Sequence, residues 1–90
     1  MEYKIGDRIV HCGDELEFQI AGLLHTNEIE FIHESERKDQ RLDFYLPKQD
    51  IYIEVKKYSS IRSANQLDSQ DNVILIQGLK ALNFFQYLFI

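Results

Sequence analysis

The strongest constraint on the fold is a pair of alternating segments, residues 41–46 and 51–56, separated by four residues. In both segments every second residue is apolar, which is typical of strands with one buried face. The linking segment 47–50 contains proline, lysine and aspartate, and its length predicts a tight hairpin between antiparallel strands. With the two middle residues of the link at the tip, the register places Asp43 directly across from Glu54.

The whole chain, residues 1–90, reads as a single domain, because no repeat, low-complexity tract or linker interrupts it. Asp14 is a good helix cap, and apolar residues then recur at helical spacing to about Thr26. Glu17 falls at the edge of this apolar stripe and can point inward. The other expected elements are strands over 29–34 and 73–76, a short helix over 60–69 and a C-terminal helix over 79–90.

The net charge of -5 disfavours a nucleic-acid partner, because Lys and Arg drive phosphate binding. The charge is unevenly distributed, however. Residues 37–62 contain seven cations and four acids, a local charge of +3, and the remainder of the chain carries -8. A basic middle segment can still contact a duplex, above all once divalent cations sit on its carboxylates.

Cysteine usage and hydropathy indicate the compartment. Cys12 is the only cysteine, so it forms no internal disulfide and belongs to no two-thiol metal site. Such usage is typical of a reducing cytoplasm. Residues 1–13 are too polar for a signal peptide, and no apolar run approaches the roughly 20 residues of a membrane span. We therefore expect a soluble, cytoplasmic protein.

The opposed acids of the hairpin predict a metal site. Two carboxylates that face each other on neighbouring strands repel unless something compensates their charge. Mg²⁺ does so well, since it favours oxygen ligands and keeps several waters. The expected ligands are Asp43, Glu54 and the carbonyl of Val55. Lys56 lies on the same sheet face as Glu54, where an ammonium group orients an attacking water or stabilises phosphate charge. Phosphodiester hydrolysis needs a water of lowered pKa and compensation of the charge on the phosphoryl oxygens, and a metal ion provides both.

The run RLDFYLPKQDIYIEVK, residues 41–56, resembles the strand hairpin of the PD-(D/E)XK nuclease superfamily. In that family an Asp and a Glu-x-Lys on consecutive strands form the metal site, and the matching residues are Asp43, Glu54 and Lys56. A glutamate on the preceding helix often joins them, and Glu17 matches it. Leu42 replaces the proline of the family's name. The resemblance implies an α/β fold with a restriction-endonuclease-like core. That core has a central mixed four-stranded sheet flanked by helices, in the order α-β-β-β-α-β-α.

The resemblance also implies a function, a metal-dependent endonuclease that hydrolyses DNA with Mg²⁺ or Mn²⁺. Glu17 is then expected to bind a second ion or a water. The helix after the lysine often contacts nucleic acid in the family, and Arg62 and Gln66 occupy corresponding places. Lys57 and Arg41 belong to the same basic segment and are further candidates for DNA contact. The small size is similar to that of phage-type junction resolvases. It implies a phage- or mobile-element-encoded homodimer that cuts branched or nicked DNA.

Other interpretations remain open. Asp43, Glu54 and Lys56 are also what a solvated strand face with a cross-strand ion pair contains. A nuclease-like fold can serve as a catalytically inactive DNA- or protein-binding module, or as an accessory subunit of a larger nuclease complex. The helix over 79–90 has more apolar surface than one core face needs, which fits a second subunit and equally fits a deeply packed helix.

The histidines give no metal-binding pattern. None of them has a partner at ligand spacing, and we assign no catalytic role to His11, His25 or His33. No phosphate-cradling glycine loop is present, which argues against nucleotide hydrolysis.

Overall fold

The computed structural model of the chain describes residues 1–56 and 72–89. The expected helix over 60–69 and three candidates for DNA contact, Lys57, Arg62 and Gln66, lie outside these residues. The described elements are β1 (Glu2–Ile5), β2 (Arg8–His11), α1 (Glu15–Thr26), β3 (Ile32–His33), the 3₁₀ turn η1 (Glu34–Glu36), β4 (Phe44–Leu46), β5 (Ile51–Lys56), β6 (Val73–Gln77) and α3 (Gly78–Tyr87).

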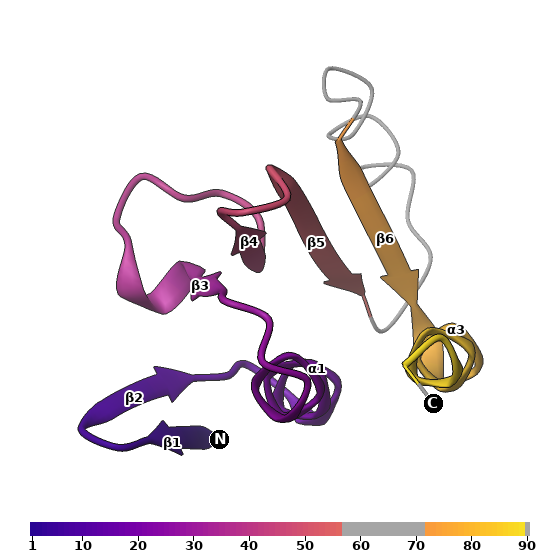
Figure 1. Ribbon diagram of the computed structural model, residues 1–90, viewed down its shortest axis with the longest axis horizontal. Helices are drawn as coiled ribbons and strands as arrows, with labels where there is room; N and C mark the ends of the chain where they lie inside the picture. Colours follow the sequence, from indigo (N-terminus) through magenta and orange to yellow (C-terminus); the bar gives the residue numbers. More distant parts are fainter. Residues whose placement is uncertain (57–71, 90) are drawn as a thin grey trace.

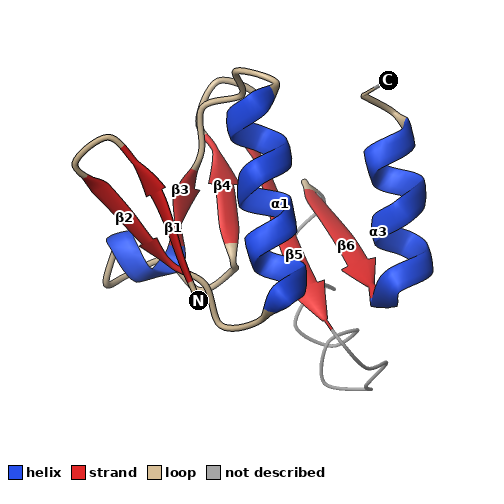
Figure 2. Ribbon diagram, turned by 90° about the horizontal axis from the view of Figure 1, so that it is seen from below, coloured by secondary structure: helices blue, strands red, loops and turns tan. Residues whose placement is uncertain are grey.

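The strands form two sheets. β1 and β2 make an antiparallel hairpin, and the other four strands make a sheet in the order β3-β4-β5-β6. β4 is antiparallel to both of its neighbours, whereas β6 runs parallel to β5, so the sheet is mixed. Figure 1 shows α1 and α3 below this sheet, and in the view at right angles both helices cover the same face (Figure 2). The predicted α/β fold with a mixed four-stranded sheet is therefore confirmed.

The β4–β5 hairpin has the predicted register. Phe44 faces Ile53 and Tyr45 faces Tyr52. Phe44 and Ile53 are fully buried, whereas the two tyrosines are half-buried on the other face of the hairpin. Asp50 closes the turn with a φ of 54°, a left-handed conformation that aspartate tolerates better than most residues.

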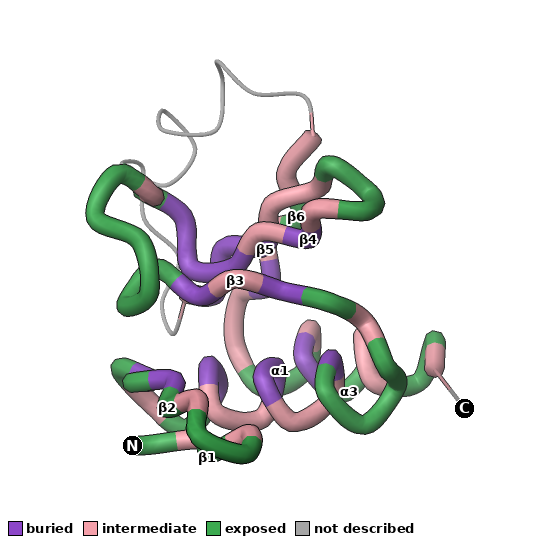
Figure 3. The backbone as a smooth tube through the Cα atoms, turned by 60° about the vertical axis from the view of Figure 1, so that its left-hand side comes forward, coloured by how far each residue is buried: buried purple, intermediate pink, exposed green. Residues whose placement is uncertain are grey.

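The core lies between the sheet and the two helices. α1 begins as predicted, because the Asp14 carboxylate accepts the backbone N–H of Glu17 at 2.9 Å. Its apolar stripe packs on alternate residues of the strands, and buried segments gather on α1, β3, β4 and β5 (Figure 3). Each such side chain stabilises the fold by roughly 1.5–3 kcal/mol. The largest fully buried apolar residues are Phe44, Ile20, Leu24, Ile53, Leu82 and Val10.

The N-terminal hairpin was not predicted. Its strands combine charged and apolar residues, and the turn is made by Gly6, whose φ of 60° suits glycine. Val10 is fully buried in the core, and the ring of Tyr3 packs edge-on against Phe18 of α1 with centroids 5.5 Å apart. Residues 2–11 thus extend the hydrophobic core beyond the expected elements.

The strand expected over 29–34 is shorter than predicted, because β3 ends at His33 and η1 begins at Glu34. Glu36 fixes this turn by accepting the His33 backbone N–H at 3.0 Å. Arg8 of β2 then donates to both carboxylate oxygens of Glu36, each at 2.6 Å. A hydrogen-bonded turn therefore replaces the end of the strand.

The strand expected over 73–76 is present, but it is less buried than its apolar sequence indicates. Ile74 is 37% exposed, and Ile76 is the buried residue of β6. β6 is the last strand in the sheet order, with β5 as its neighbour, which explains the exposure. Among the described residues no helix is both long and apolar enough to cross a membrane.

Candidate metal centre

The site forms where β4 separates from β5. The backbone pairing of β4 with β5 ends at Phe44. Beyond it the side chain of Asp43 bonds to β5, because its Oδ2 accepts the backbone N–H of Val55 at 2.7 Å. On the other side, the carbonyl of Asp43 accepts the backbone N–H of Glu34 at 3.0 Å. The backbone of Asp43 is thus hydrogen-bonded to η1, while its carboxylate is hydrogen-bonded to β5. These bonds hold the carboxylate at the point where β4 and β5 separate, which we call the strand fork.

Three acids follow one another across the sheet at the fork. Extending the β3–β4 register by one residue pairs Glu34 with Asp43, and extending the β4–β5 register pairs Asp43 with Glu54. Asp43 is 8% exposed and Glu54 is 4% exposed, whereas Glu34 is exposed. Like charges placed in this way destabilise a sheet unless something compensates them.

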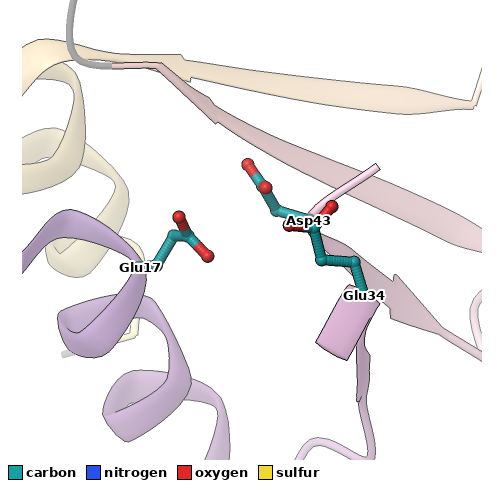
Figure 4. A group of neighbouring side chains, drawn as sticks. All are labelled: Glu17, Glu34 and Asp43. Carbon is teal, nitrogen blue, oxygen red and sulfur yellow. The ribbon is translucent and has the colours of Figure 1, made fainter. Parts of the chain in front are cut away.

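Glu17 adds a fourth acid from α1. Carboxylate oxygens of Glu17, Glu34 and Asp43 lie within 4.8 Å of one another, and Figure 4 shows the three side chains converging. Glu17 is 8% exposed and lies against Gly13, where an added Cβ would be 2.7 Å from Oε2. Glycine at this position therefore leaves room for the carboxylate.

The pKa values show how the cluster carries its charge. Burial raises the pKa of Glu54 to about 8, helped by a hydrogen bond with Asp43 and by the charge of Asp43, and Lys56 opposes the shift. Burial also raises the pKa of Glu34, together with the charges of Asp43 and Glu17. At neutral pH the metal-free site therefore holds Glu54 as a protonated carboxyl.

Glu17 has the opposite shift. Burial alone would raise its pKa, but hydrogen bonds from His33 and from the Gly13 backbone outweigh burial. The nearby ammonium group of Lys56 lowers the pKa further. Glu17 is thus kept ionised, as a ligand for a cation must be.

The donor to Glu17 is a buried histidine that the sequence analysis left without a role. His33 is 1% exposed, and its Nδ1 accepts the backbone N–H of Ser35 at 3.1 Å. The proton therefore sits on Nε2, which donates to Oε1 of Glu17 at 2.7 Å. The Ser35 hydroxyl lies 2.8 Å from Nδ1 and accepts the backbone N–H of His11 at 3.2 Å. This chain of hydrogen bonds fixes the orientation of both the imidazole ring and the Glu17 carboxylate.

The structure brings together the four residues that the sequence proposed as catalytic, Glu17, Asp43, Glu54 and Lys56. The N–H of Val55 bonds to Asp43, and its carbonyl as a metal ligand stays a prediction. Arg41 is exposed on the loop that leads into Asp43.

Glu34 was not predicted as a site residue; it was expected only as the last residue of the strand over 29–34. Glu34 lies beside Asp43 because of the β3–β4 register. The sequence between the two strands contains no turn signal from which this register could be predicted.

The fold and the site together define a small α/β protein with a carboxylate cluster at a strand fork and a lysine beside it. The chain matches none of the protein families, curated proteins or solved structures with which it was compared.

Proposed function

We propose that this protein is a divalent-metal-dependent endonuclease that hydrolyses DNA phosphodiester bonds, with a restriction-endonuclease-like core of the PD-(D/E)XK kind. The observation that carries the proposal is the convergence of carboxylate oxygens from Glu17, Glu34 and Asp43, with Glu54 hydrogen-bonded to Asp43. The charge of Lys56 acts on both Glu17 and Glu54. A solvated strand face does not fit this site, because Glu17, Asp43 and Glu54 are buried.

The donor set favours Mg²⁺ or Mn²⁺. In the described part of the chain the three clustered ligands, Glu17, Glu34 and Asp43, are all carboxylates, which suit hard cations better than zinc or copper. Such an ion would lower the pKa of a bound water and would stabilise the negative charge on the phosphoryl oxygens. Asp43 and Glu54 hold the ion, with the Val55 carbonyl as a further ligand. Glu17 binds a second ion or a water.

Lys56 acts at the same site. It follows Glu54 by two residues on β5, and its positive charge lowers the pKa of Glu17, Glu34 and Glu54. Since Lys56 is within electrostatic reach of the whole cluster, its ammonium group can position the attacking water or stabilise the negative charge of the phosphate. Arg41 contacts the DNA from the neighbouring loop. Lys57, Arg62 and Gln66, which lie outside the described residues, stay candidates for DNA contact.

A homodimer is part of the proposal. Four large apolar side chains are exposed on and just after α3, namely Leu79, Phe84, Tyr87 and Leu88. Exposed apolar residues that follow one another along a helix are typical of a surface that is covered in an assembly. A second copy of the chain provides such a cover and a second cleavage site for branched DNA.

Incubation of the purified protein with supercoiled plasmid and with a four-way junction tests the activity. Cleavage is expected with Mg²⁺ or Mn²⁺ and not with chelator, and Glu54→Gln or Lys56→Met should lower the rate by at least about 100-fold. Glu15→Gln, on the exposed side of α1, is the matched control and should cleave normally. Metal-independent DNA binding without cleavage would instead support the inactive binding module, and activity only after addition of a partner protein would support the accessory subunit.

A further inference from the structure

A cavity of about 160 Å³ is lined by chain neighbours of two acids of the candidate metal centre. Its lining comes from the loop that leads into Asp43 and from one residue of β5, and consists of Arg37, Asp39, Gln40, Arg41, Leu42 and Tyr52. Leu42 directly precedes Asp43, and Tyr52 lies two residues before Glu54 on the same face of β5. The cavity therefore shares the loop before Asp43 and one face of β5 with the two acids that we propose to hold the metal.

One wall of the cavity is aromatic and held in place. The ring of Tyr52 lies 4.6 Å from the ring of Tyr45, its partner in the β4–β5 register, with an angle of 36° between them. The hydroxyl of Tyr45 donates to Oδ1 of Asp50 at 2.9 Å, which fixes this second ring. Neither tyrosine belongs to the hydrophobic core. The pair thus offers a preformed aromatic surface beside the cluster.

The other walls are cationic and polar. Arg37 and Arg41 are both exposed. In the described part of the chain, the only ion pair that either arginine forms joins Arg37 to Asp39 at 3.9 Å. Since the Asp39 side chain is 85% exposed, this pair neutralises little of the positive charge. Gln40 donates to the carbonyls of Ile32 and Leu42, and in the described residues its Oε1 is a buried acceptor without a partner.

These walls match one ligand chemistry. Aromatic rings stack on nucleobases of any sequence, and guanidinium groups stack on bases and bind phosphates. In an intact duplex the bases are stacked and paired, and a base enters a side pocket only when it is unpaired or extruded. A cavity of this kind next to a hydrolytic site therefore suits a nucleotide that lies outside the duplex.

We propose that this cavity binds the base of an unpaired nucleotide adjacent to the scissile phosphate, and that the protein cleaves DNA at junctions between paired and unpaired strands. The proposal rests on the proposed nuclease function and names its substrate class. Tyr52 stacks on the base, and Arg41 contacts the phosphate that connects the base to the cleavage site.

The test is a cleavage assay on flapped DNA in which single nucleotides beside the cleavage site are replaced by abasic ones. Removal of one base should slow the wild type by about tenfold, as expected for the loss of one base–aromatic stack. Tyr52→Leu, which removes the ring, should cleave the intact and abasic substrates at equal rates. Arg41→Ala provides a second variant, outside the sheet, in case Tyr52→Leu does not fold. Lys38→Ala removes an exposed cation of the same loop that does not line the cavity, and it should keep the full tenfold discrimination.

A second readout separates this inference from the nuclease function. With chelator present, a flap carrying 2-aminopurine at the unpaired position should change its fluorescence on binding wild type and should not do so with Tyr52→Leu. Absence of any metal-dependent cleavage would overturn the nuclease proposal. Equal cleavage of intact and abasic DNA by wild type, or equal 2-aminopurine signals from both proteins, would overturn the base-binding cavity alone.

Discussion

Glu17 and Glu54 are both buried carboxyls, but their neighbours shift their pKa values in opposite directions. Glu17 receives hydrogen bonds from His33 and from the Gly13 backbone, which favour its ionised form. Burial favours the protonated form of Glu54, and the hydrogen bond and charge of Asp43 add to this effect. The metal-free cluster therefore combines one ready ligand with one that must first lose its proton.

Glu54 should make the stability of the metal-free protein depend on pH. Its pKa is about 8 in the folded protein and near the ordinary 4.5 in the unfolded chain, so the folded state binds more protons between these values. Its contribution to stability is thus present below pH 4.5 and is lost as the pH rises through about 8. Urea denaturation in chelator across this range measures the loss. Glu54→Gln should flatten the profile, and a variant profile identical to that of wild type would contradict the assignment.

His33 should matter for both stability and metal affinity. His33→Phe keeps an aromatic ring against Phe44, whose centroid is 5.0 Å away, but removes the side-chain donor to the Glu17 carboxylate. The free energy of unfolding should fall by about 1–3 kcal/mol. Affinity for Mn²⁺ should fall by roughly 10–100-fold, as for other residues that orient a ligand. Denaturation and Mn²⁺ titration measure the two effects.

The control for His33 is His11→Ala, because the His11 side chain is 63% exposed and only its backbone joins the hydrogen-bond chain. Both properties should stay unchanged in this variant. Unaltered Mn²⁺ affinity in a folded His33→Phe protein would show that Glu17 needs no orientation by the imidazole.

At the level of elements, the β4–β5 hairpin and its register could be predicted, since they depend on local alternation and on a short turn. Asp43, Glu54 and Lys56 belong to this hairpin, and the predicted N-cap of α1 placed Glu17. The two missed residues, His33 and Glu34, join the site through the β3–β4 pairing. Its long connection contains no turn signal that fixes a register, so the pairing could not be derived from sequence.

The segment before α1 also shapes the site, and Gly13→Ala tests this. The new Cβ would lie 2.7 Å from Oε2 of Glu17, the flexible end of that side chain, so the carboxylate should move while the fold remains intact. We expect a stability change below about 1 kcal/mol and a loss of Mn²⁺ affinity of roughly tenfold.

Gly22→Ala is the control for Gly13, because its new Cβ would meet the Tyr3 ring at 3.4 Å. It should bind Mn²⁺ as wild type does. Equal Mn²⁺ affinity in the two alanine variants would contradict a role of Glu17 in metal binding.

At the level of the whole molecule, the acids lie where α1 meets the sheet, whereas the exposed apolar side chains lie on and just after α3. α3 packs against α1 and β6, yet Leu82 is its one fully buried residue. Ala81 and Phe85 are half-buried against the core. Leu79, Phe84, Tyr87 and Leu88 stay exposed in a single chain, and their exposure is the physical basis of the proposed dimer.

Light scattering over a range of protein concentrations tests the dimer. Wild type should have the mass of two chains at high concentration, and Phe84→Asp should have the mass of one, since Phe84 is exposed in the single chain and its replacement costs the fold little. Lys80→Ala, an exposed change on the same helix, should behave as wild type. A wild-type protein that stays monomeric at every concentration would contradict the proposed dimer.

The central claim is that the acids at the strand fork bind a divalent metal ion, and calorimetric titration of Mn²⁺ into the chelator-treated protein tests it most directly. At about pH 8, near the pKa of Glu54, wild type should bind Mn²⁺ and release protons, so the measured heat should vary with the ionisation enthalpy of the buffer. Asp43→Asn, whose amide oxygen can still accept the Val55 N–H, should fold normally and lose this binding. Wild-type protein that takes up no Mn²⁺ or Mg²⁺, or an Asp43→Asn variant that binds Mn²⁺ as tightly as wild type, would contradict the claim.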